Sequence, residues 1–135
     1  MLEFKTELVC KSLEKGGYWE LTKDFIVDLG FPGDGDLLVI PKGFRTDLGS
    51  IPIFIPRWIA DPQVAPRSFT LHDFLYQNQF TTQLVADSLL NEGMIIEGAN
   101  WFQRFTVYRG LRIGGMFAWK KRAKELSKNS SSFDS

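Results

Sequence analysis

The chain has 135 residues, with 16 Lys and Arg against 16 Asp and Glu, so its formal net charge is zero. An apolar fraction of 44%, including 12 Phe and 4 Trp, excludes a disordered chain and predicts one domain with a hydrophobic core. No apolar run is long enough to span a membrane, and the N-terminal sequence lacks a signal-peptide core, which predicts folding in a cytoplasm. The lone Cys10 cannot form an internal disulfide and is expected to be a small strand residue facing the core.

The charges are unevenly distributed along the chain. Residues 1–100 hold 8 Lys and Arg against 14 Asp and Glu, a balance of −6, whereas residues 101–128 hold 8 against 1, a balance of +7. The basic end suits either an acidic partner or a solvated helix face. It has no interleaved base-stacking aromatics and the chain is neutral overall, so nothing favours nucleic-acid binding.

The first forty residues have the pattern of β-strands. Alternating or β-branched runs occur at 18–22, 25–27 and 37–40. Residues 30–36 are dense in Gly, Pro and Asp, which predicts a turn. We therefore expect a small antiparallel sheet. Prolines then recur through residues 41–66, and because each removes a backbone donor, this segment is expected to be an irregular, ordered loop.

Helical periodicity begins after Pro66. Apolar and aromatic residues recur at helical spacing around LHDFLY at 71–76, and Thr81 or Thr82 can cap a second helix over about 83–92. A third amphipathic stretch begins near Ala99 and continues into the basic end. The predicted fold class is therefore α+β, with a small N-terminal antiparallel β-sheet, a Pro-rich ordered loop and three C-terminal helices.

Two further features concern the C-terminal part. The glycine pair Gly114-Gly115 predicts a kink or a close helix contact in the third helix. Residues 127–135 are polar, and such ends are normally frayed. The expected organisation is a single domain over 1–126 and a polar tail over 127–135.

Polar chemistry is concentrated at the first predicted helix. His72 and Tyr76 are one turn apart and face the same way, while Asp73 projects toward a different neighbour. An imidazole can accept a proton from water and a carboxylate can hold a cation, so this pair permits metal-assisted hydrolysis. In the next helix Asp87 shares a face with Leu90, where a carboxylate needs a specific partner. His72 is the natural partner, because a carboxylate on one ring nitrogen leaves the other free as a base.

Other interpretations of the same residues remain open. His72 could instead form a hydrogen bond within the core, without catalysis. The single histidine excludes zinc hydrolases and the phosphohydrolases that need several histidines. A Ser-His-Asp arrangement with Ser50 or Ser68 as nucleophile remains formally open, although neither serine lies in a glycine-flanked strand-to-helix turn.

The segment TDLGSIP at 46–52 is a second polar concentration. Side chains such as those of Thr46, Asp47 and Ser50 readily bond nearby backbone donors, so the loop can simply satisfy itself. Alternatively, the same residues line a cleft against the helix that carries His72. The sequence favours neither interpretation.

Three spaced segments together resemble a known family. PKGFRTDLGSIP at 41–52, LHDFLY at 71–76 and ADSLL at 86–90 resemble the PxGFxTDxASIP, HDxLY and ADxxF motifs of an uncharacterised domain family of tailed bacteriophages and prophages. Gly49 replaces the usual Ala and Leu90 the usual aromatic residue. The resemblance implies a protein made in the host cytoplasm and incorporated into the virion beside other phage structural proteins. It implies no settled activity.

A looser similarity is to secretory-type phospholipases, including the disulfide-free versions in small viral capsids. These carry HDxxY on one helix and an Asp on the next. The similarity implies that His72 is the base, that Asp73 binds calcium, and that Asp87 and Tyr76 orient the histidine. Their YxGxG calcium loop has only a distant imitation at 31–35, far upstream of the helix. Since calcium takes six or more oxygens, Asp47 and nearby backbone carbonyls are the expected co-ligands.

Two hypotheses follow for the function. The first is a hydrolase that acts on host-envelope lipid or cell-wall bonds, with the site residues His72, Asp87, Tyr76, Asp73 and Asp47. The second is a non-catalytic virion protein of the tail, baseplate or capsid, in which the same cluster is a structural hydrogen-bond network. A hydrolase carried in the particle would satisfy both.

Overall fold

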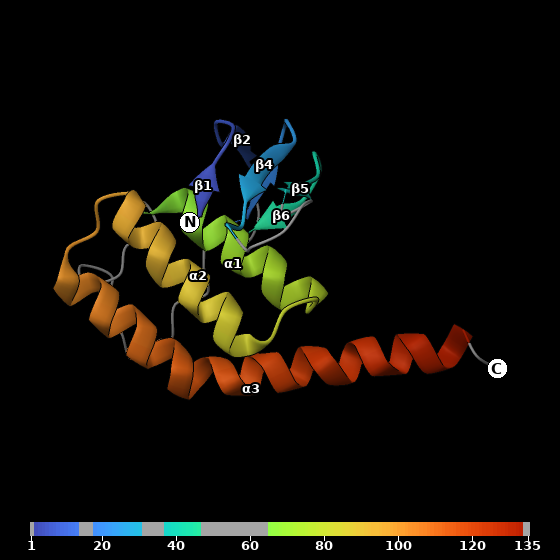
Figure 1. Cartoon of the computed structure of the whole chain (residues 1–135). Coiled ribbons are helices and arrows are strands. Elements are labelled where there is room, and N and C mark those ends of the chain that lie inside the picture. The colour runs from blue at the N-terminus through green and yellow to red at the C-terminus, as the bar shows by residue number, and fades with distance from the viewer. Residues whose placement is uncertain (1, 14–17, 31–36, 47–64, 134–135) are drawn as a thin grey trace.

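The structure, a computed structural model, describes residues 2–13, 18–30, 37–46 and 65–133. The described strands precede the helices along the chain, an α+β arrangement that confirms the predicted class (Figure 1). The strands are β1 (Glu3–Phe4), β2 (Cys10–Ser12), β3 (Trp19–Leu21), β4 (Phe25–Asp28), β5 (Leu37–Ile40) and β6 (Arg45–Thr46). The helices are α1 (Pro66–Asn78), α2 (Gln83–Ile96) and α3 (Trp101–Phe133).

The described strands form two small antiparallel sheets instead of one. Their orders are β1-β4-β5 and β2-β3-β6. The sequence pattern does not predict β1 and β6, because each has two residues and alternation cannot show over that length. β6 lies within the segment expected to be irregular and pairs with β3 through Trp19 and Thr46. Cys10 lies in β2, as expected, and is partly buried.

The main core joins the strands to α1 and α2. Alternation in β4 turns Phe25 and Val27 inward, and both are fully buried. Helix α1 contributes Leu71 and Leu75, which are one turn apart. Burial of each such side chain stabilises the fold by roughly 1.5–3 kcal/mol. A second apolar cluster lies among the helices and contains Ala65, Phe69, Leu90, Met94, Ala99, Val107 and Leu111.

Helix α1 is held at both ends by the other two helices. At its start, Glu97 from the end of α2 accepts hydrogen bonds from the backbone N–H groups of Arg67 (3.2 Å) and Ser68 (3.0 Å) and from the Ser68 hydroxyl (2.6 Å). A carboxylate is favourable there because the first N–H groups of a helix lack internal partners. At its end, Arg122 of α3 donates from Nε to the Gln77 carbonyl at 2.9 Å. The position of α1 therefore depends on both neighbours.

The starts of α2 and α3 follow from local capping. Thr82 accepts a hydrogen bond from the Val85 N–H at 3.2 Å, as predicted. Before α3, the Asn100 side chain accepts from the Gln103 N–H at 2.8 Å, and the Gln103 side chain accepts from the Asn100 N–H at 3.1 Å. This reciprocal pair satisfies two donors that a helix start leaves unpaired.

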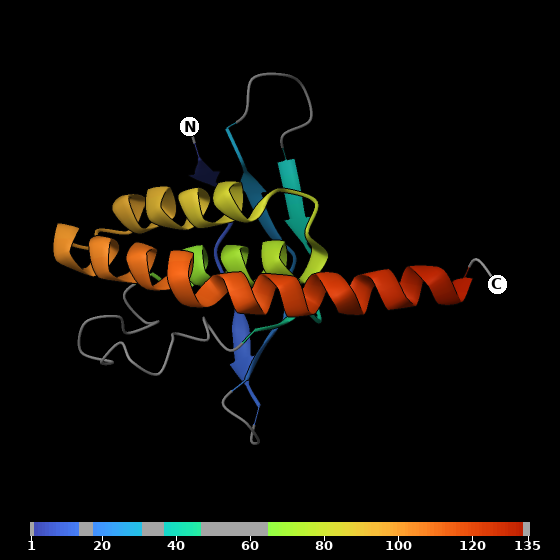
Figure 2. The ribbon, with the colours of Figure 1, turned by 90° about the horizontal axis from the view of Figure 1, so that it is seen from below.

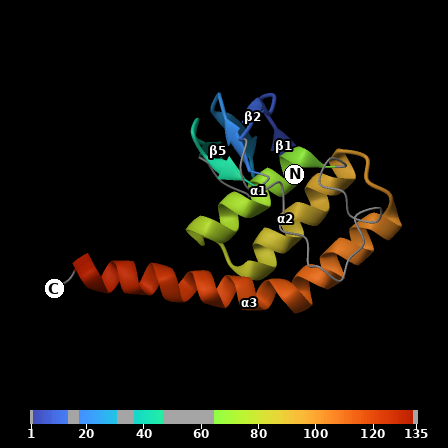
Figure 3. The ribbon, with the colours of Figure 1, turned by 180° about the vertical axis from the view of Figure 1, so that it is seen from behind.

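Helix α3 is longer than the sequence pattern predicts. It continues through the polar residues from Ser127 as far as Phe133, so most of the segment expected to fray is helical. Figures 1 and 3 show that α3 changes direction in its middle and that its C-terminal half extends beyond α1 and α2. In the part of the chain that the structure describes, no helix has the length and apolar character needed to cross a membrane.

Candidate functional site

A buried carboxylate lies at the centre of the three helices. Asp87 of α2 has no exposed surface. Its Oδ1 accepts from the Tyr76 hydroxyl at 2.8 Å and lies 2.8 Å from Nε2 of His72, while its Oδ2 accepts from Arg112 of α3 at 3.1 Å. Because an unpaired buried charge is strongly unfavourable, these partners are what allows a carboxylate here. We call Asp87, His72, Tyr76 and Arg112 the Asp87 cluster.

The Asp87 cluster defines the proton positions on His72. Arg112 and the Tyr76 hydroxyl both donate to Asp87, so Asp87 is the hydrogen-bond acceptor of this cluster. The proton between His72 and Asp87 is therefore assigned to Nε2. In the neutral ring, Nδ1 then has a free lone pair. Nδ1 makes no hydrogen bond to any residue that the structure describes, although the His72 side chain is only 8% exposed.

Tyr76 packs directly on His72. Their ring centroids are 4.2 Å apart, and the Tyr76 hydroxyl also accepts a hydrogen bond from Gln83 at 3.3 Å. Burial, followed by the negative charge of Asp87 and the hydrogen bond to it, raises the pKa of Tyr76 well above its usual range. Tyr76 therefore stays protonated and acts as a donor to Asp87, not as a base.

A glycine allows α3 to approach this cluster. A Cβ added at Gly115 would lie 2.7 Å from the Tyr76 hydroxyl oxygen, closer than real contacts allow. One turn further on, Trp119 makes an edge contact with the Tyr76 ring, with centroids 4.9 Å apart. The close helix contact predicted from the glycine pair is therefore confirmed at Gly115. It brings Arg112 within reach of Asp87.

The structure brings together three residues that the sequence nominated as catalytic. The predicted contact between His72 and Asp87 is present, and Tyr76 joins it on the same side of α1. Arg112 was not predicted. A sequence signal for it exists, because Arg112 is at helical spacing from Tyr108 and Gly115, on the side of α3 that faces α2.

The other site residues predicted from the sequence either lie outside the Asp87 cluster or belong to parts of the chain that the structure does not describe. Asp73 is half-buried and accepts a long hydrogen bond of 3.5 Å from Gln77, away from the Asp87 cluster. Thr46 is fully buried in β6. Asp47 and Ser50, and with them the expected cleft, fall outside the described residues. Ser68 gives its hydroxyl proton to Glu97 and forms no bond to His72, which argues against a Ser68 nucleophile.

The residues that the structure describes do not include a complete calcium site. Within residues 2–13, 18–30, 37–46 and 65–133, no three His, Cys, Asp or Glu side chains are grouped so that they could hold a metal ion. Asp73 alone supplies too few oxygens, because calcium takes six to eight. The predicted co-ligand Asp47 is not among the residues described.

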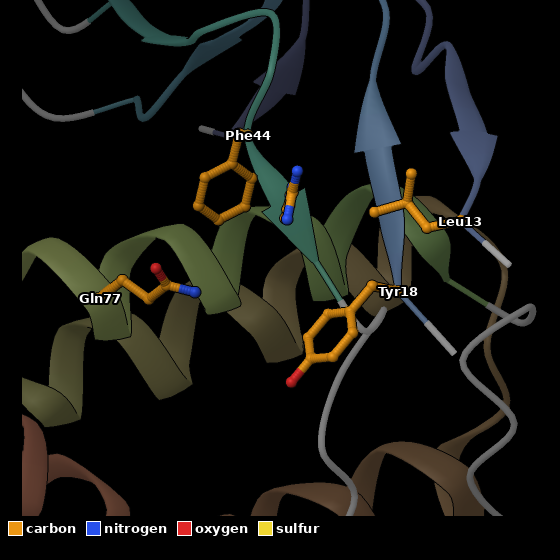
Figure 4. Close-up of a pocket in the computed structure, with 5 residues that line it drawn as sticks. Leu13, Tyr18, Phe44 and Gln77 are labelled. Carbon is orange, nitrogen blue, oxygen red and sulfur yellow. The ribbon is translucent and has the colours of Figure 1, made fainter. Parts of the chain in front are cut away.

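A cavity of about 290 Å³ lies between the β2-β3-β6 sheet and α1 (Figure 4). It is lined by Leu13, Tyr18, Phe44, Arg45 and Gln77. No member of the Asp87 cluster lines it. Gln77, which lines the cavity, also donates a hydrogen bond to Asp73. The cavity therefore lies on the side of α1 that carries Asp73.

The fold and the site together define an α+β protein in which three helices surround the buried carboxylate of Asp87. The donors to this carboxylate are ionisable side chains. The chain belongs to the family described as Protein of unknown function (DUF1353), whose model matches residues 9–111. The match includes His72, Tyr76 and Asp87 and ends just before Arg112. No curated protein and no solved structure matches the chain.

Proposed function

We propose that the chain is a hydrolase of envelope lipid or cell-wall bonds, with His72 as its general base. One observation carries this proposal: the buried Asp87 bonds to Nε2 of His72 and leaves Nδ1 without a partner among the described residues. A carboxylate on the far nitrogen fixes the tautomer and stabilises the imidazolium that forms during proton transfer. Tyr76 and Arg112 position Asp87 for this role.

The residues of the cluster would act in a fixed order. Nδ1 of His72 takes a proton from a water molecule, whose oxygen attacks the carbonyl carbon of the substrate. Asp87 stabilises the resulting imidazolium across the ring, and Arg112 holds Asp87 in place through their salt bridge. The imidazolium then gives its proton to the leaving-group atom, the oxygen of an ester or the nitrogen of an amide, as the bond of that atom to carbon breaks, which returns His72 to its neutral form.

Calcium is a separate proposal that rests on Asp73 and Asp47. Bound calcium would polarise the substrate carbonyl. Because the described residues do not form a calcium site by themselves, no step above is routed through the metal. Isothermal titration with calcium, on the protein and on Asp73→Asn, tests this proposal directly. Heat of binding that Asp73→Asn abolishes would support it, and no binding to either protein would refute it.

The phage context is a further proposal, supported by the resemblance of the three motifs to a family of tailed bacteriophages. In this proposal the protein is made in the host cytoplasm and joins other structural proteins in the virion. Mass spectrometry of purified particles from a phage that encodes the chain tests it. Absence of the chain from complete particles would contradict virion incorporation.

A non-catalytic structural role is the second candidate. It is favoured by the salt bridge between Arg112 and Asp87, which lets the cluster join three helices regardless of any reaction. In that case His72 is simply one of three donors to a buried acceptor.

Two substitutions at His72 separate the candidates. His72→Ala leaves Asp87 with one donor fewer, which costs on the order of 1–3 kcal/mol of unfolding free energy in either case. His72→Gln can still donate to Asp87 but cannot act as a general base. We expect His72→Gln to recover most of the melting temperature without recovering hydrolysis of ester lipid or cell-wall substrates, or infectivity of a phage that carries it. Recovery of both stability and infectivity in His72→Gln would refute the proposal that the protein is a hydrolase.

A further inference from the structure

Helix α3 carries a row of exposed large apolar side chains. Each of them is between 40% and 73% exposed. They are Trp101, Phe102, Phe105, Ile113, Met116 and Phe117. Single exposed apolar residues are ordinary, but six along one helix form a surface that usually has a partner.

These residues share one side of α3. At about 100° per residue, the six positions fall within roughly half of the helix circumference. The other side carries Val107, Leu111 and Gly115, which are buried against α1 and α2. Among the residues that the structure describes, one apolar side of the helix is therefore used in packing against α1 and α2, and the other is exposed. In Figure 2, α3 runs beside α2 and overlaps α1. We call the exposed side the outer face of α3.

The outer face is surrounded by positive charge. Residues 101–128 contain 8 Lys and Arg and a single acidic residue, Glu125, giving 8 − 1 = +7, of which the charge of Arg112 is paired with Asp87 of α2. Glu125 is paired with Arg122 at 3.0 Å. Arg109 lies over the Phe105 ring at 5.2 Å, and Lys120, Lys121 and Lys124 are exposed in the turns that follow the apolar row.

The charge indicates what covers the outer face. A second copy packed through the same face would place two strongly positive helices side by side, which is unfavourable. An apolar row flanked by Lys and Arg suits a surface that is apolar inside and anionic outside, as in a bilayer with acidic headgroups. Long Lys and Arg side chains can reach the headgroups while their stems and the aromatic rings lie deeper. We propose that the outer face of α3 binds the surface of an anionic lipid membrane.

This proposal is independent of hydrolysis at His72, because none of the residues in the row belongs to the Asp87 cluster. It differs from membrane spanning, since the helix would lie in the plane of the headgroups. Both components are needed: the charge draws the helix to the surface, and the apolar row holds it there.

Sedimentation with phospholipid vesicles tests the proposal on the full chain. We expect binding to phosphatidylglycerol vesicles and little binding to phosphatidylcholine vesicles at the same lipid concentration. The triple variant Lys120→Gln, Lys121→Gln and Lys124→Gln should weaken binding by about 100-fold at low salt, since each cation near an anionic surface contributes about fivefold. Its matched control removes three exposed lysines elsewhere: Lys5→Gln, Lys23→Gln and Lys42→Gln.

A second pair of variants tests the apolar row. Ile113→Ser with Phe117→Ser removes two side chains that are 64% and 73% exposed, and should weaken binding by about tenfold or more. Leu37→Ser with Leu84→Ser removes two comparably exposed side chains away from α3 and should leave binding unchanged. Circular dichroism of each variant checks that the helices are retained.

Three outcomes would overturn the proposal. One is no binding to phosphatidylglycerol vesicles at low salt. Another is an equal loss in the variants of α3 and in their controls. The third is binding to double-stranded DNA that depends on the lysines but is insensitive to Ile113→Ser with Phe117→Ser, which would assign the charge to nucleic acid.

Discussion

Two carboxylates, Asp87 within α2 and Glu97 at its C-terminal cap, each accept hydrogen bonds from α1, but their donors differ in kind. Glu97 accepts from two backbone N–H groups and the Ser68 hydroxyl. Asp87 accepts from Tyr76 and Arg112 and pairs with His72. The donors to Glu97 are backbone N–H groups and a hydroxyl, which do not act as acids or bases near neutral pH, so that contact can only position the helix. The contact of Asp87 also fixes which ring nitrogen of His72 faces the carboxylate, so of these two contacts only that of Asp87 is suited to chemistry.

The largest expected effect separates these two carboxylates directly. Asp87→Ala leaves Arg112 without its partner and should lower the free energy of unfolding by about 3 kcal/mol, since the Arg112 side chain is already 37% exposed and can be solvated in part. Glu97→Ala removes a helix cap and should cost about 1 kcal/mol. Urea denaturation measures both. An equal cost for the two substitutions would remove the distinction between them.

The packing of α3 against the Asp87 cluster gives a smaller effect. Gly115→Ala places a methyl group against the Tyr76 hydroxyl and should cost about 1–2 kcal/mol of unfolding free energy, despite the better helix propensity of Ala. In a Tyr76→Phe background the hydroxyl is absent, so the same change should cost less. Thermal unfolding of the two single variants and the double variant tests this. Strictly additive effects would mean that Gly115 does not approach Tyr76 closely.

The smallest effect is a change in pH dependence. The pKa of Tyr76 is raised in the folded protein, whereas in the unfolded chain it is about 10. Above that pH the unfolded state binds fewer protons than the folded state, so stability falls as pH rises. Below it the contribution is fully present. We therefore expect the stability of the native protein to fall more steeply above about pH 10 than that of Tyr76→Phe, with no difference in slope below that pH. If stability falls equally steeply with pH in the native protein and in Tyr76→Phe, the conclusion that the fold keeps Tyr76 protonated is wrong.

Local features of the fold follow from the sequence, whereas the long-range contacts do not. Helical spacing predicts α1 and α2, and the apolar face around Asp87 predicts its contact with His72. Both predictions depend on residues that lie close together in the sequence. The pairing of β6 with β3 and the capping of α1 by Glu97 depend on residues brought together only by folding.

Arg112 is a residue of the site whose long-range contact also does not follow from the sequence. Its spacing on α3 places it at the border between the packed side and the outer face, where a cation is equally expected to extend into solvent. Only the position of Gly115 against Tyr76 brings α3 close enough for the Arg112 pair with Asp87. The part of the site assigned to residues 47–50 stays a prediction, because those residues lie outside the description.

The tautomer of the single histidine tests the central claim most directly. Because His72 is the only histidine in the chain, a long-range nitrogen–proton NMR spectrum of the uniformly labelled protein reports on this ring without any substitution. At mildly alkaline pH we predict a neutral ring with the proton on Nε2 and an unprotonated Nδ1, as required of a general base held by Asp87. A proton on Nδ1, with Nε2 unprotonated, would contradict the account.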